Sequence, residues 1–394
     1  MRPVSVRQAG GGRLGFLFNH DTLHQIAHTA PIISELVQIK APASITILTS
    51  SAEQESLVRS FLGPEVVDNV QFVSLTIDWL ARFMDWLIGK AVPVQRVAML
   101  LQNRSIFADL DVLVVPETTS TMLRTRFGLS GLGLVYVPHG AGDRSIGFRN
   151  DVREFDFVLL SGTKVRDRML KMGLITEAGH AIVGYPKFDT IGPEPEPVFT
   201  DGKPVVVYNP HFDPYLSSWY KMGEQVLEQF AAQDRFNLIF APHVMMHRRK
   251  YHLSVEHFRI GAVSDLAEKF MGRANIHIDT GSARSSDMSY TRQADIYLGD
   301  ASSQVYEFLL TPRPCIFLNS HDANWRDNPD YGHWALGEVL GDVADLPAAL
   351  DRAVAAPDAY RVVQEAAVND TFALSDFPSS RRAAQAIAAF LARP

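Results

Sequence analysis

The chain has 394 residues, of which 46% are apolar, so it can bury a sizeable core and is long enough for two or three domains. A formal net charge of -7, with 37 Lys and Arg against 44 Asp and Glu, excludes a general polyanion binder, and we expect no nucleic-acid partner. The single cysteine, Cys315, excludes an internal disulfide and a cysteine-based zinc site, which fits the cytosol. The sequence contains neither a signal-peptide pattern nor a run of about 18 apolar residues, so we expect a cytoplasmic protein that does not span a membrane.

Short runs of β-branched and aromatic residues alternate with helical patterns, which is typical of α/β units around parallel sheets. We expect strands at Leu14–Phe18, Ser44–Leu48, Gln71–Leu75, Val112–Val115, Leu134–Val137, Phe157–Leu160, Ala181–Val183, Val205–Tyr208, Leu238–Phe240, Ile276–Ile278, Ile296–Leu298 and Cys315–Leu318. We expect helices at His20–Ile39, Ala52–Phe61, Asp78–Leu101, Ser120–Phe127, Thr163–Met172, Ser217–Ala232, Ser254–Met271, Ser286–Gln293, Ser303–Leu309, Leu346–Ala355 and Arg381–Ala392.

A Pro-rich stretch, IGPEPEPVFTDGKP, interrupts this alternation after residue 190 and can continue neither a helix nor a central strand. We therefore expect an N-terminal domain over residues 1–190, a linker over 191–203 and a second domain over 204–375. The last segment, residues 376–394, is an Ala-rich helix that we expect to pack back on the N-terminal domain. Two doubly wound domains bind ligands beyond the carboxyl ends of their strands, so functional residues should follow strands directly.

The segment Ile77–Leu101 is rich in tryptophan and phenylalanine but is interrupted by charged residues. As an amphipathic helix it could lie on the inner face of a membrane through Trp79, Phe83 and Trp86, or hold a lipid-linked acceptor. The alternative is a helix packed in a core or at a subunit interface.

The motif VPHGAGDR, residues 137–144, follows an expected strand of the first domain. It places the imidazole of His139 at a strand end, and Gly140 lets the backbone approach a ligand closely. Asp143 could orient the imidazole, and Arg144 could bind a phosphate group. The alternative is a glycine turn that carries surface charges.

Three further candidate residues follow strands in the same way. Lys187, in the sequence VGYPKFD, could face an anionic ligand, although a structural hinge also explains this turn. His211 and His243 each follow a proline, and each could contact a phosphate group or a nucleobase. His243 and His247 have a spacing that can bind a metal on a helix, but the glutamate of a zincin motif is missing, so we expect no metal site.

The most specific motif is ADIYLGDASSQVYEFLLTPRPCIFLN, residues 294–319, which predicts a strand, a tight turn, a helix N-terminus and another strand. Asp300, Ser302 and Ser303 lie at the turn, where a helix N-terminus and two hydroxyl groups could bind phosphate. Glu307, one helical turn further on, could accept hydrogen bonds from ribose hydroxyls. The loop Asp279, Thr280, Gly281 and Ser282 ends a neighbouring strand and could hold the base through its backbone. An ordinary N-cap is the alternative explanation of the serines.

Together these motifs resemble the CDP-glycerol glycerophosphotransferase family of teichoic-acid-type polymerases and primases, over about residues 116–319. Within the last motif, Glu307-Phe308 stands where that family has an acidic and aromatic pair. Arg313-Pro314 stands where the family has a strand that begins with Lys or Arg followed by Pro. Two departures are HGAGDRSIGF, where the family commonly has a Lys-rich segment, and Lys187, where it commonly has Arg.

The resemblance implies a GT-B fold, in which two Rossmann-like doubly wound domains face each other across a cleft. It implies that His139 acts as the base and that His243, Ser302 and Ser303 hold the donor phosphates. We expect a metal-independent enzyme without a cofactor, which moves a glycerophosphate group from a CDP-linked donor to a hydroxyl of a cell-surface glycan or glycolipid. The leaving nucleotide would be stabilised at the phosphate site.

Other functions remain open on the same fold. A nucleotide-sugar glycosyltransferase would use the same phosphate site and attack an anomeric carbon. A UDP-sugar 2-epimerase would require a carboxylate-rich loop where this chain has VPHGAGDR. A non-catalytic nucleotide-binding protein is the alternative outside enzymes.

Overall fold

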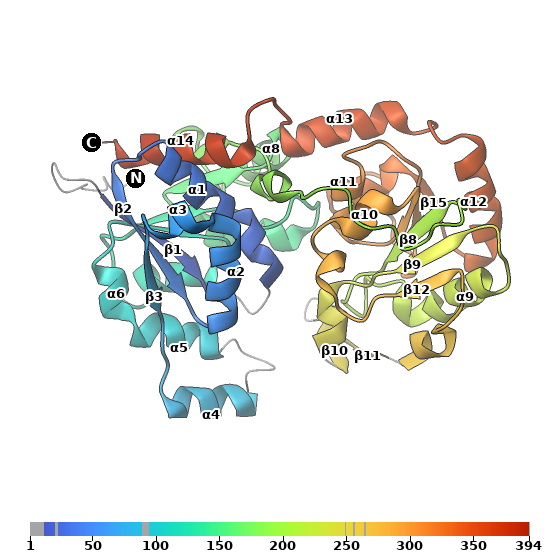
Figure 1. Cartoon of the computed structure of the whole chain (residues 1–394), viewed down its shortest axis with the longest axis horizontal. Coiled ribbons are helices and arrows are strands. Elements are labelled where there is room, and N and C mark those ends of the chain that lie inside the picture. The colour runs from blue at the N-terminus through green and yellow to red at the C-terminus, as the bar shows by residue number, and fades with distance from the viewer. Residues whose placement is uncertain are drawn as a thin grey trace. The chain divides into compact units, whose positions relative to one another are not determined.

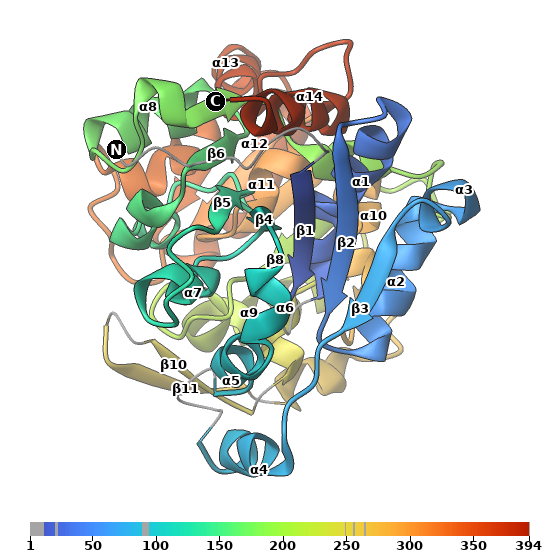
Figure 2. The same cartoon turned by 90° about the vertical axis from the view of Figure 1, so that its left-hand side faces the viewer.

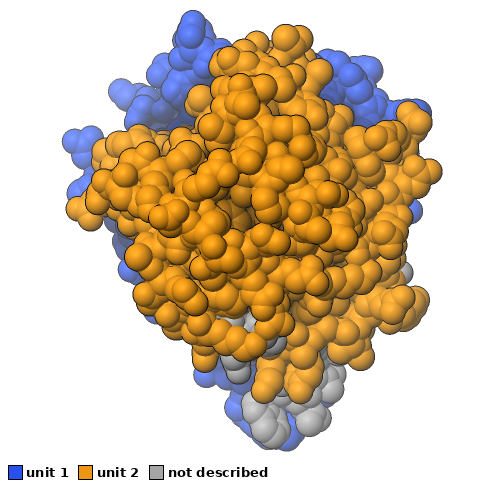
Figure 3. Space-filling model, turned by 90° about the vertical axis from the view of Figure 1, so that its right-hand side faces the viewer, with its two compact units in different colours: residues 1–139, 148–190, 370–394 blue, residues 140–147, 191–369 orange. Residues whose placement is uncertain are grey.

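The computed structural model describes residues 12–19, 23–88, 94–248, 250–254, 257–263 and 265–393. The chain divides into two compact units (Figure 3), and neither is a continuous stretch of sequence. Unit 1 comprises residues 1–139, 148–190 and 370–394, and unit 2 comprises residues 140–147 and 191–369. The short segment 140–147, which follows a strand of unit 1, therefore packs as part of unit 2.

Unit 1 contains a seven-stranded sheet with the order β3-β2-β1-β4-β5-β6-β7, in which all neighbours are parallel. Figure 1 labels its strands β1, β2 and β3. The strands are β1 (Gly12–Phe18), β2 (Ala43–Thr49), β3 (Gln71–Ser74), β4 (Val112–Val115), β5 (Gly133–Tyr136), β6 (Phe157–Leu160) and β7 (His180–Ile182). The order reverses between β1 and β4, which makes the carboxyl ends of these two strands the switch point of a doubly wound sheet.

Helices cover both faces of this sheet because alternate strand residues point to opposite sides. The helices of unit 1 are α1 (Ala30–Gln38), α2 (Ala52–Leu62), α3 (Pro64–Val67), α4 (Trp79–Ile88), α5 (Val94–Gln102), α6 (Arg104–Ala108), α7 (Met122–Thr125), α8 (Thr163–Lys171) and α14 (Ser379–Leu391). Phe16 of β1 packs in one core with Ile33 of α1 and Ile387 of α14, whereas Leu17 packs in the opposite core with Leu100 of α5. The C-terminal helix α14 thus completes the core of unit 1, where Phe390 stacks on Phe157 at a centroid distance of 5.1 Å.

Unit 2 contains a six-stranded parallel sheet with the order β12-β9-β8-β13-β14-β15 and a separate two-stranded ribbon. Its strands are β8 (Val205–Asn209), β9 (Asn237–Phe240), β12 (Ile276–Ile278), β13 (Ile296–Gly299), β14 (Cys315–Leu318) and β15 (Glu338–Leu340), and the ribbon is β10 (Tyr251–Ser254) with β11 (Arg259–Ala262). Its helices are α9 (Trp219–Ala231), α10 (Ser289–Gln293), α11 (Gln304–Phe308) and α12 (Leu346–Ala355), and α13 (Arg361–Phe372) runs from unit 2 into unit 1. The switch point of this sheet lies between β8 and β13.

Three expected helices differ from the structure. Residues 254–271, expected as one helix, contain β11 and a 3-10 helix at Asp265–Phe270, because the alternation in YHLS and RIGA has the two-residue period of strands. The expected helix at residues 78–101 is instead α4 and α5, and Pro93 in the intervening sequence is a helix breaker. Residues 20–39 give a 3-10 helix at Leu23–His28 followed by α1, which begins next to Pro31.

The sequence analysis also missed the edge strand β15 and the helix α13. Cys315 is buried on β14, as a core residue should be. Among the described residues, no helix combines the length and the apolar character that crossing a bilayer requires.

Candidate functional site

The loops at the switch point of unit 2 carry two histidines in the same tautomer. The backbone N–H of Asp213 donates to Nδ1 of His211 at 3.0 Å, and the N–H of Met245 donates to Nδ1 of His243 at 3.2 Å. Because Nδ1 accepts in both rings, the proton of each neutral ring is on Nε2. Both imidazoles therefore offer an N–H donor, and their centroids lie 5.6 Å apart.

Burial keeps these two rings neutral. Desolvation, together with a smaller effect of the nearby His252, lowers the pKa of His243 to about 4. Desolvation also lowers the pKa of His211 well below its usual value, with contributions from His243 and Arg144. The pair thus acts as hydrogen-bond donors rather than as proton acceptors near pH 7.

Asp300, at the end of β13, is fully buried and organises the loops around it. Its Oδ2 accepts from the N–H and the hydroxyl of Ser218 at 2.6 and 2.8 Å, and its Oδ1 accepts from the N–H of His211 and Ala301 at 2.9 and 2.6 Å. The two carboxylate oxygens therefore accept four hydrogen bonds, although desolvation still raises the pKa of Asp300. We expected Asp300 to contact the donor, but this placement favours a positioning role in which it holds the loop of His211 against β13.

The two serines after Asp300 differ in exposure. Ser302 is buried, and its Oγ accepts from the N–H of Gln304 at 3.3 Å, one residue ahead of the N-cap position that Ser303 occupies. Ser303 is exposed and makes no capping hydrogen bond through its side chain. The helix that follows, α11, has only five residues, so the expected contribution of a helix dipole to phosphate binding is small. The hydroxyl of Ser303 is the stronger candidate ligand group.

The segment 140–147 enters unit 2 and is fixed there by Asp143. Oδ2 of Asp143 accepts from the hydroxyl of Tyr306 at 2.7 Å and from the N–H of His333 at 2.9 Å, and Nδ1 of His333 lies 3.1 Å away. Nε2 of His333 faces the carbonyl oxygen of Asp300 at 2.9 Å. Both ring nitrogens therefore face acceptor oxygens. We expected Asp143 to orient His139, and these contacts instead give it partners within unit 2.

The same segment brings Arg144 and Gly142 to the switch point. Arg144 is close enough to His211 and His321 to lower the pKa of both rings and hydrogen-bonds Tyr331. A Cβ at Gly142 would lie 2.9 Å from the Cβ of Ser303, so only glycine allows this close approach. Gly140 is exposed, and a Cβ there would meet nothing within 4 Å.

The loop after β12 meets the loop after β9. Asp279 is buried, its Oδ1 accepts from the N–H of Ser282 at 2.9 Å, and its Oδ2 has no hydrogen-bond partner in the described part of the chain. Gly281 has a φ of +107°, which favours glycine, and lies against the ring of His247. Thr280, Gly281 and Ser282 are exposed, as a backbone contact to a base would require. Glu307, expected at the ribose, is buried on α11.

Unit 1 carries its own cluster at its switch point. Nδ1 of the half-buried His139 lies 2.7 Å from the carbonyl oxygen of Pro116, which follows β4. A carbonyl only accepts, so Nδ1 carries the proton and Nε2 is the acceptor of the neutral ring. Desolvation lowers the pKa of His139, against the opposing effects of the Pro116 hydrogen bond and Glu117. This tautomer is the opposite of that of His211 and His243.

His139 belongs to a cluster with three buried side chains, of which His28 and Glu117 act on its ring and Lys187 acts on His28. His28 lies at a centroid distance of 6.5 Å, and desolvation, Lys187 and His139 lower its pKa well below the usual value. Lys187 is buried in a 3-10 helix after β7 and thus belongs to unit 1. Glu117 is also buried, and its carboxylate accepts from the N–H of Thr119 at 2.5 Å and from the N–H of Ser120 at 3.2 Å.

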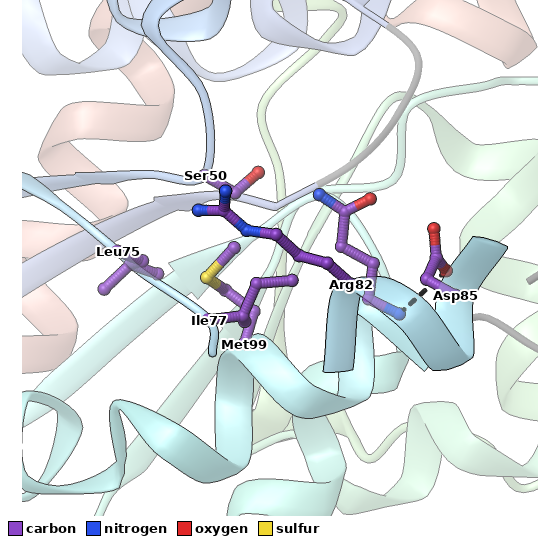
Figure 4. A pocket seen from close by; sticks show the side chains of 7 residues that line it. Ser50, Leu75, Ile77, Arg82, Asp85 and Met99 are labelled. Carbon is purple, nitrogen blue, oxygen red and sulfur yellow. Dashed lines mark hydrogen bonds between the residues drawn. The ribbon is translucent and has the colours of Figure 1, made fainter. Parts of the chain in front are cut away.

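A cavity of about 210 Å³ opens beyond the carboxyl ends of β2 and β3 in unit 1 (Figure 4). It is lined by Ser50, Leu75, Ile77, Arg82, Asp85, Gln95 and Met99. Figure 4 shows the guanidinium of Arg82, on α4, extending toward Ser50, while Oδ1 of Asp85 accepts from the N–H of Gln95 at 3.1 Å. The cavity therefore combines an apolar floor with charged groups supplied by α4.

The sequence analysis missed several residues of these clusters. His28, Glu117 and His333 lie in no recognised motif, and Tyr306 lies within the motif at residues 294–319 but was not selected there. Glu117 comes two residues after the buried strand β4 and could have been selected on that basis. In the described ranges, no group of three or more His, Cys, Asp and Glu side chains is arranged to hold a metal ion.

Comparisons with known proteins give a result for structure but not for sequence. No protein-family model matches the chain, and no curated protein matches it significantly in sequence. A solved UDP-N-acetylglucosamine 2-epimerase is similar with a TM-score of 0.63 at 11% identity, covering 98% of both chains. The UDP-GlcNAc 2-epimerase of Methanocaldococcus jannaschii, solved with UDP-GlcNAc and UDP, has a TM-score of 0.60 at 12% identity, covering 95% of this chain and 99% of that one. The calicheamicin glycosyltransferase CalG4 has a TM-score of 0.55 at 16% identity, covering 98% and 99%. With its two doubly wound parallel-sheet units, the chain has the GT-B fold of glycosyltransferases and UDP-GlcNAc 2-epimerases.

Proposed function

We propose that the chain is a glycosyltransferase-like enzyme that uses a nucleotide sugar as its donor. The observation that supports this most directly is the pair of opposite tautomers. His211 and His243 offer Nε2–H donors in unit 2, whereas His139 offers an Nε2 acceptor in unit 1. An N–H donor can hydrogen-bond the oxygens of a diphosphate, and a nitrogen acceptor can take a proton as a general base does.

Unit 2 holds the diphosphate of the donor in this proposal. Arg144 supplies positive charge, His211 and His243 supply neutral N–H groups, and Ser303 supplies an exposed hydroxyl. These groups follow β8, β9 and β13 or lie on the segment 140–147, so they gather at the switch point where doubly wound sheets bind ligands. As the nucleoside diphosphate leaves, they stabilise the negative charge that develops on it.

Unit 1 binds the acceptor and activates it. Nε2 of His139 takes the proton of an acceptor hydroxyl while its oxygen attacks the anomeric carbon of the sugar. The bond between that carbon and the diphosphate oxygen breaks, and the electron pair leaves with the nucleoside diphosphate. The lowered pKa of His139 keeps the ring neutral and ready to accept a proton near pH 7.

Glycerophosphotransfer from a CDP-linked polyol is the second candidate, and one specific observation favours it. The motif over residues 294–319 resembles that family, with Asp300, Ser302 and Ser303 in the corresponding places. The same base would then direct the acceptor hydroxyl at phosphorus, and CMP would leave. A UDP-sugar 2-epimerase reaction is the third candidate, and it fits the structural neighbours better than glycerophosphotransfer does, because two of those named above are UDP-GlcNAc 2-epimerases.

A ligand panel followed by product analysis separates these candidates. The full chain is mixed with UDP-GlcNAc, UDP, CDP-glycerol or CMP, and its thermal midpoint is measured. We expect a shift of several degrees with the uridine compounds and a smaller one with the cytidine compounds, since a ligand that binds only the folded state raises the midpoint. A shift with CDP-glycerol and none with any nucleotide sugar would replace the main proposal by the second.

Reaction products then distinguish transfer from epimerisation. Incubation with UDP-GlcNAc and no acceptor should leave the sugar configuration unchanged by proton NMR, with at most slow release of UDP. Accumulation of the 2-epimer would support the third candidate and overturn transfer. Ser303→Ala should weaken nucleotide binding about tenfold by calorimetry, whereas Ser286→Ala, at a serine on the same unit whose hydroxyl donates to the Ala283 carbonyl, should not.

A further inference from the structure

The cavity of unit 1 is lined by an arginine whose side chain has no anionic partner among the described residues. Arg82 lies on α4, which follows β3 and packs on α5 (Figure 2). Asp85 lies three positions further along α4, a spacing at which oppositely charged side chains can pair, but the two form no ion pair. Asp85 instead accepts from the N–H of Gln95 at the start of α5, where a carboxylate is favoured by the free N–H groups of the helix. The guanidinium of Arg82 extends across the cavity toward Ser50 (Figure 4).

The other groups that line the cavity suit a small hydroxylated ligand. The hydroxyl of Ser50, which directly follows β2, donates to Oε1 of Gln54 at 2.9 Å, so its oxygen can still accept from a ligand. The side chains of Leu75, Ile77 and Met99 are buried and give an apolar wall for the carbon atoms of a sugar or polyol. The volume of about 210 Å³ lies below the roughly 300–1,000 Å³ of pockets for drug-sized ligands, so the cavity takes one small group.

Helix α5 connects this cavity with the candidate base. Gln95 lines the cavity, and the next residue, Arg96, is close enough to His139 to lower the pKa of its imidazole. His139 is bonded to the carbonyl of Pro116, directly after β4, whereas Ser50 directly follows β2. One strand, β1, lies between β2 and β4, so two strand spacings, or roughly 10 Å, separate the cavity from the base. A group held there is too far away to react at His139 but near enough to belong to the same acceptor molecule.

We propose that the cavity binds an anionic group, a carboxylate or a phosphate, on a sugar or polyol portion of the acceptor. Arg82 donates two hydrogen bonds to the oxygens of this group, and Ser50 accepts from a neighbouring hydroxyl. The apolar wall covers the carbon skeleton between them. This inference rests on the proposed function, in which unit 1 binds the acceptor, and it narrows the acceptor to an acidic one.

Binding of small sugars in the absence of any nucleotide tests the cavity by itself. Methyl β-D-glucuronide is anionic, methyl β-D-glucoside is neutral and methyl β-D-glucosaminide is cationic, and the three are otherwise similar in size. Glycerol 3-phosphate and glycerol form a second pair, which offers phosphate in place of carboxylate. Dissociation constants are measured with the full chain by saturation-transfer NMR. We expect an anionic member to bind about tenfold more tightly than its neutral counterpart, and the pair with the larger ratio identifies the anion.

Substitutions of Arg82 assign this binding to the cavity. Arg82→Gln should lower the affinity for the anionic sugar about tenfold, to that for the neutral sugar. Arg82→Lys should restore part of it, because an ammonium group keeps the charge but not the planar pair of donors. Arg126→Gln is the matched control, since Arg126 is an exposed arginine of unit 1 that does not line the cavity. The thermal midpoint of each variant should equal that of the parent, which establishes that the fold is intact.

A parallel titration with UDP-GlcNAc separates this inference from the proposed function. Arg82→Gln should keep the parent's shift in thermal midpoint, because the proposed donor groups belong to unit 2. If UDP-GlcNAc binds normally while the three glycosides bind equally, the cavity assignment is wrong and the proposed function stands. If the glucuronide binds through Arg82 while no nucleotide binds, the anion site is supported and the donor assignment is wrong.

Two further results would overturn the proposal. The first is a preference for the anionic sugar that Arg82→Gln leaves unchanged, which would place the anion elsewhere on the protein. The second is tighter binding of the cationic glucosaminide that Asp85→Asn abolishes, which would make Asp85 the charged group that selects the ligand.

Discussion

Nδ1 of His139 donates to the carbonyl oxygen of Pro116 at 2.7 Å, and this bond joins the loop after β5 to the loop after β4. It sets both the direction of the imidazole and its tautomer, because a backbone carbonyl cannot donate. A general base needs both properties, and here the Pro116 carbonyl supplies them.

Replacing His139 should abolish most of the activity and leave the fold intact. We expect His139→Ala to lower kcat by a factor of about 10² to 10⁴, which is the usual contribution of a general base. The measurement is turnover of the donor identified by the ligand panel. His180→Ala is the matched control, since Nδ1 of His180 also bonds a carbonyl, that of Thr176, but at the opposite end of the sheet. Full turnover by His139→Ala would remove the base from the mechanism.

The pH dependence of kcat/KM should report the same ring. Desolvation lowers the pKa of His139 from its usual value of 6.5, so the neutral form persists to lower pH. Activity should therefore be constant around pH 7 and fall only as the pH drops below 6.5. A rate profile whose acidic limb has its midpoint above 6.5 would contradict the assignment, because it would require a group whose pKa is raised.

Substitutions at Asp143 should lower stability more than they lower the rate of the chemical step. Its carboxylate holds Tyr306 and His333 together inside unit 2, and removing a charged acceptor so that buried donors lose their partner costs about 3 kcal/mol. We expect Asp143→Asn to lower the free energy of unfolding in urea by about that amount, and Tyr306→Phe by about 2 kcal/mol. If Asp143→Asn unfolded like the parent but lost a hundredfold in kcat, orientation of His139 would be its role after all.

Two glycines of the same segment should respond differently to alanine. A Cβ at Gly142 would press on Ser303, so Gly142→Ala should displace the segment and weaken nucleotide binding about tenfold. Gly140→Ala is the control, since its Cβ would meet nothing within 4 Å. Titration calorimetry with the preferred nucleotide measures both, and equal affinities for the two variants would mean that the approach of Gly142 to Ser303 does not shape the site.

Acid should begin to destabilise the protein at pH values above those at which carboxylates titrate. The pKa of His243 is lowered to about 4 in the folded state, while the unfolded state keeps the usual 6.5. The unfolded state then binds more protons between these values, so stability is complete above pH 6.5 and declines as the pH falls toward 4. His243 alone accounts for about 3 kcal/mol of this loss. His243→Gln should flatten the curve of unfolding free energy against pH, and a parent curve that is flat from pH 7 to 4 would contradict the prediction.

The parallel sheets could be predicted from the sequence because each buried strand is a short apolar run bounded by turn residues, as in VLVV at β4 and CIFL at β14. The ribbon of β10 and β11 was harder to predict, since each of its strands has only four residues and the alternation in YHLS and RIGA is correspondingly short. The edge strand β15 has three residues and only one is buried, which leaves too weak a pattern.

The candidate site was predictable where a residue directly follows a strand, as His139, His211 and His243 do. It was not predictable where the partner lies far along the chain. His333 is 190 residues from Asp143, and neither its charge nor its neighbours in sequence indicate that the two meet. Tautomers likewise depend on backbone groups such as the Pro116 carbonyl, which no residue pattern reveals.

The placement of residues 140–147 has a consequence for dissecting the protein. A fragment cut at the Pro-rich linker, beginning at residue 191, would contain the whole six-stranded sheet but not Asp143. Its buried His333 would then lack the carboxylate that now lies beside it, and Tyr306 would lose its acceptor. Unit 2 is therefore assembled from two separate pieces of the gene. A cut at the Pro-rich linker would remove one of these pieces, so the linker is not the boundary at which unit 2 can be separated as a folding fragment.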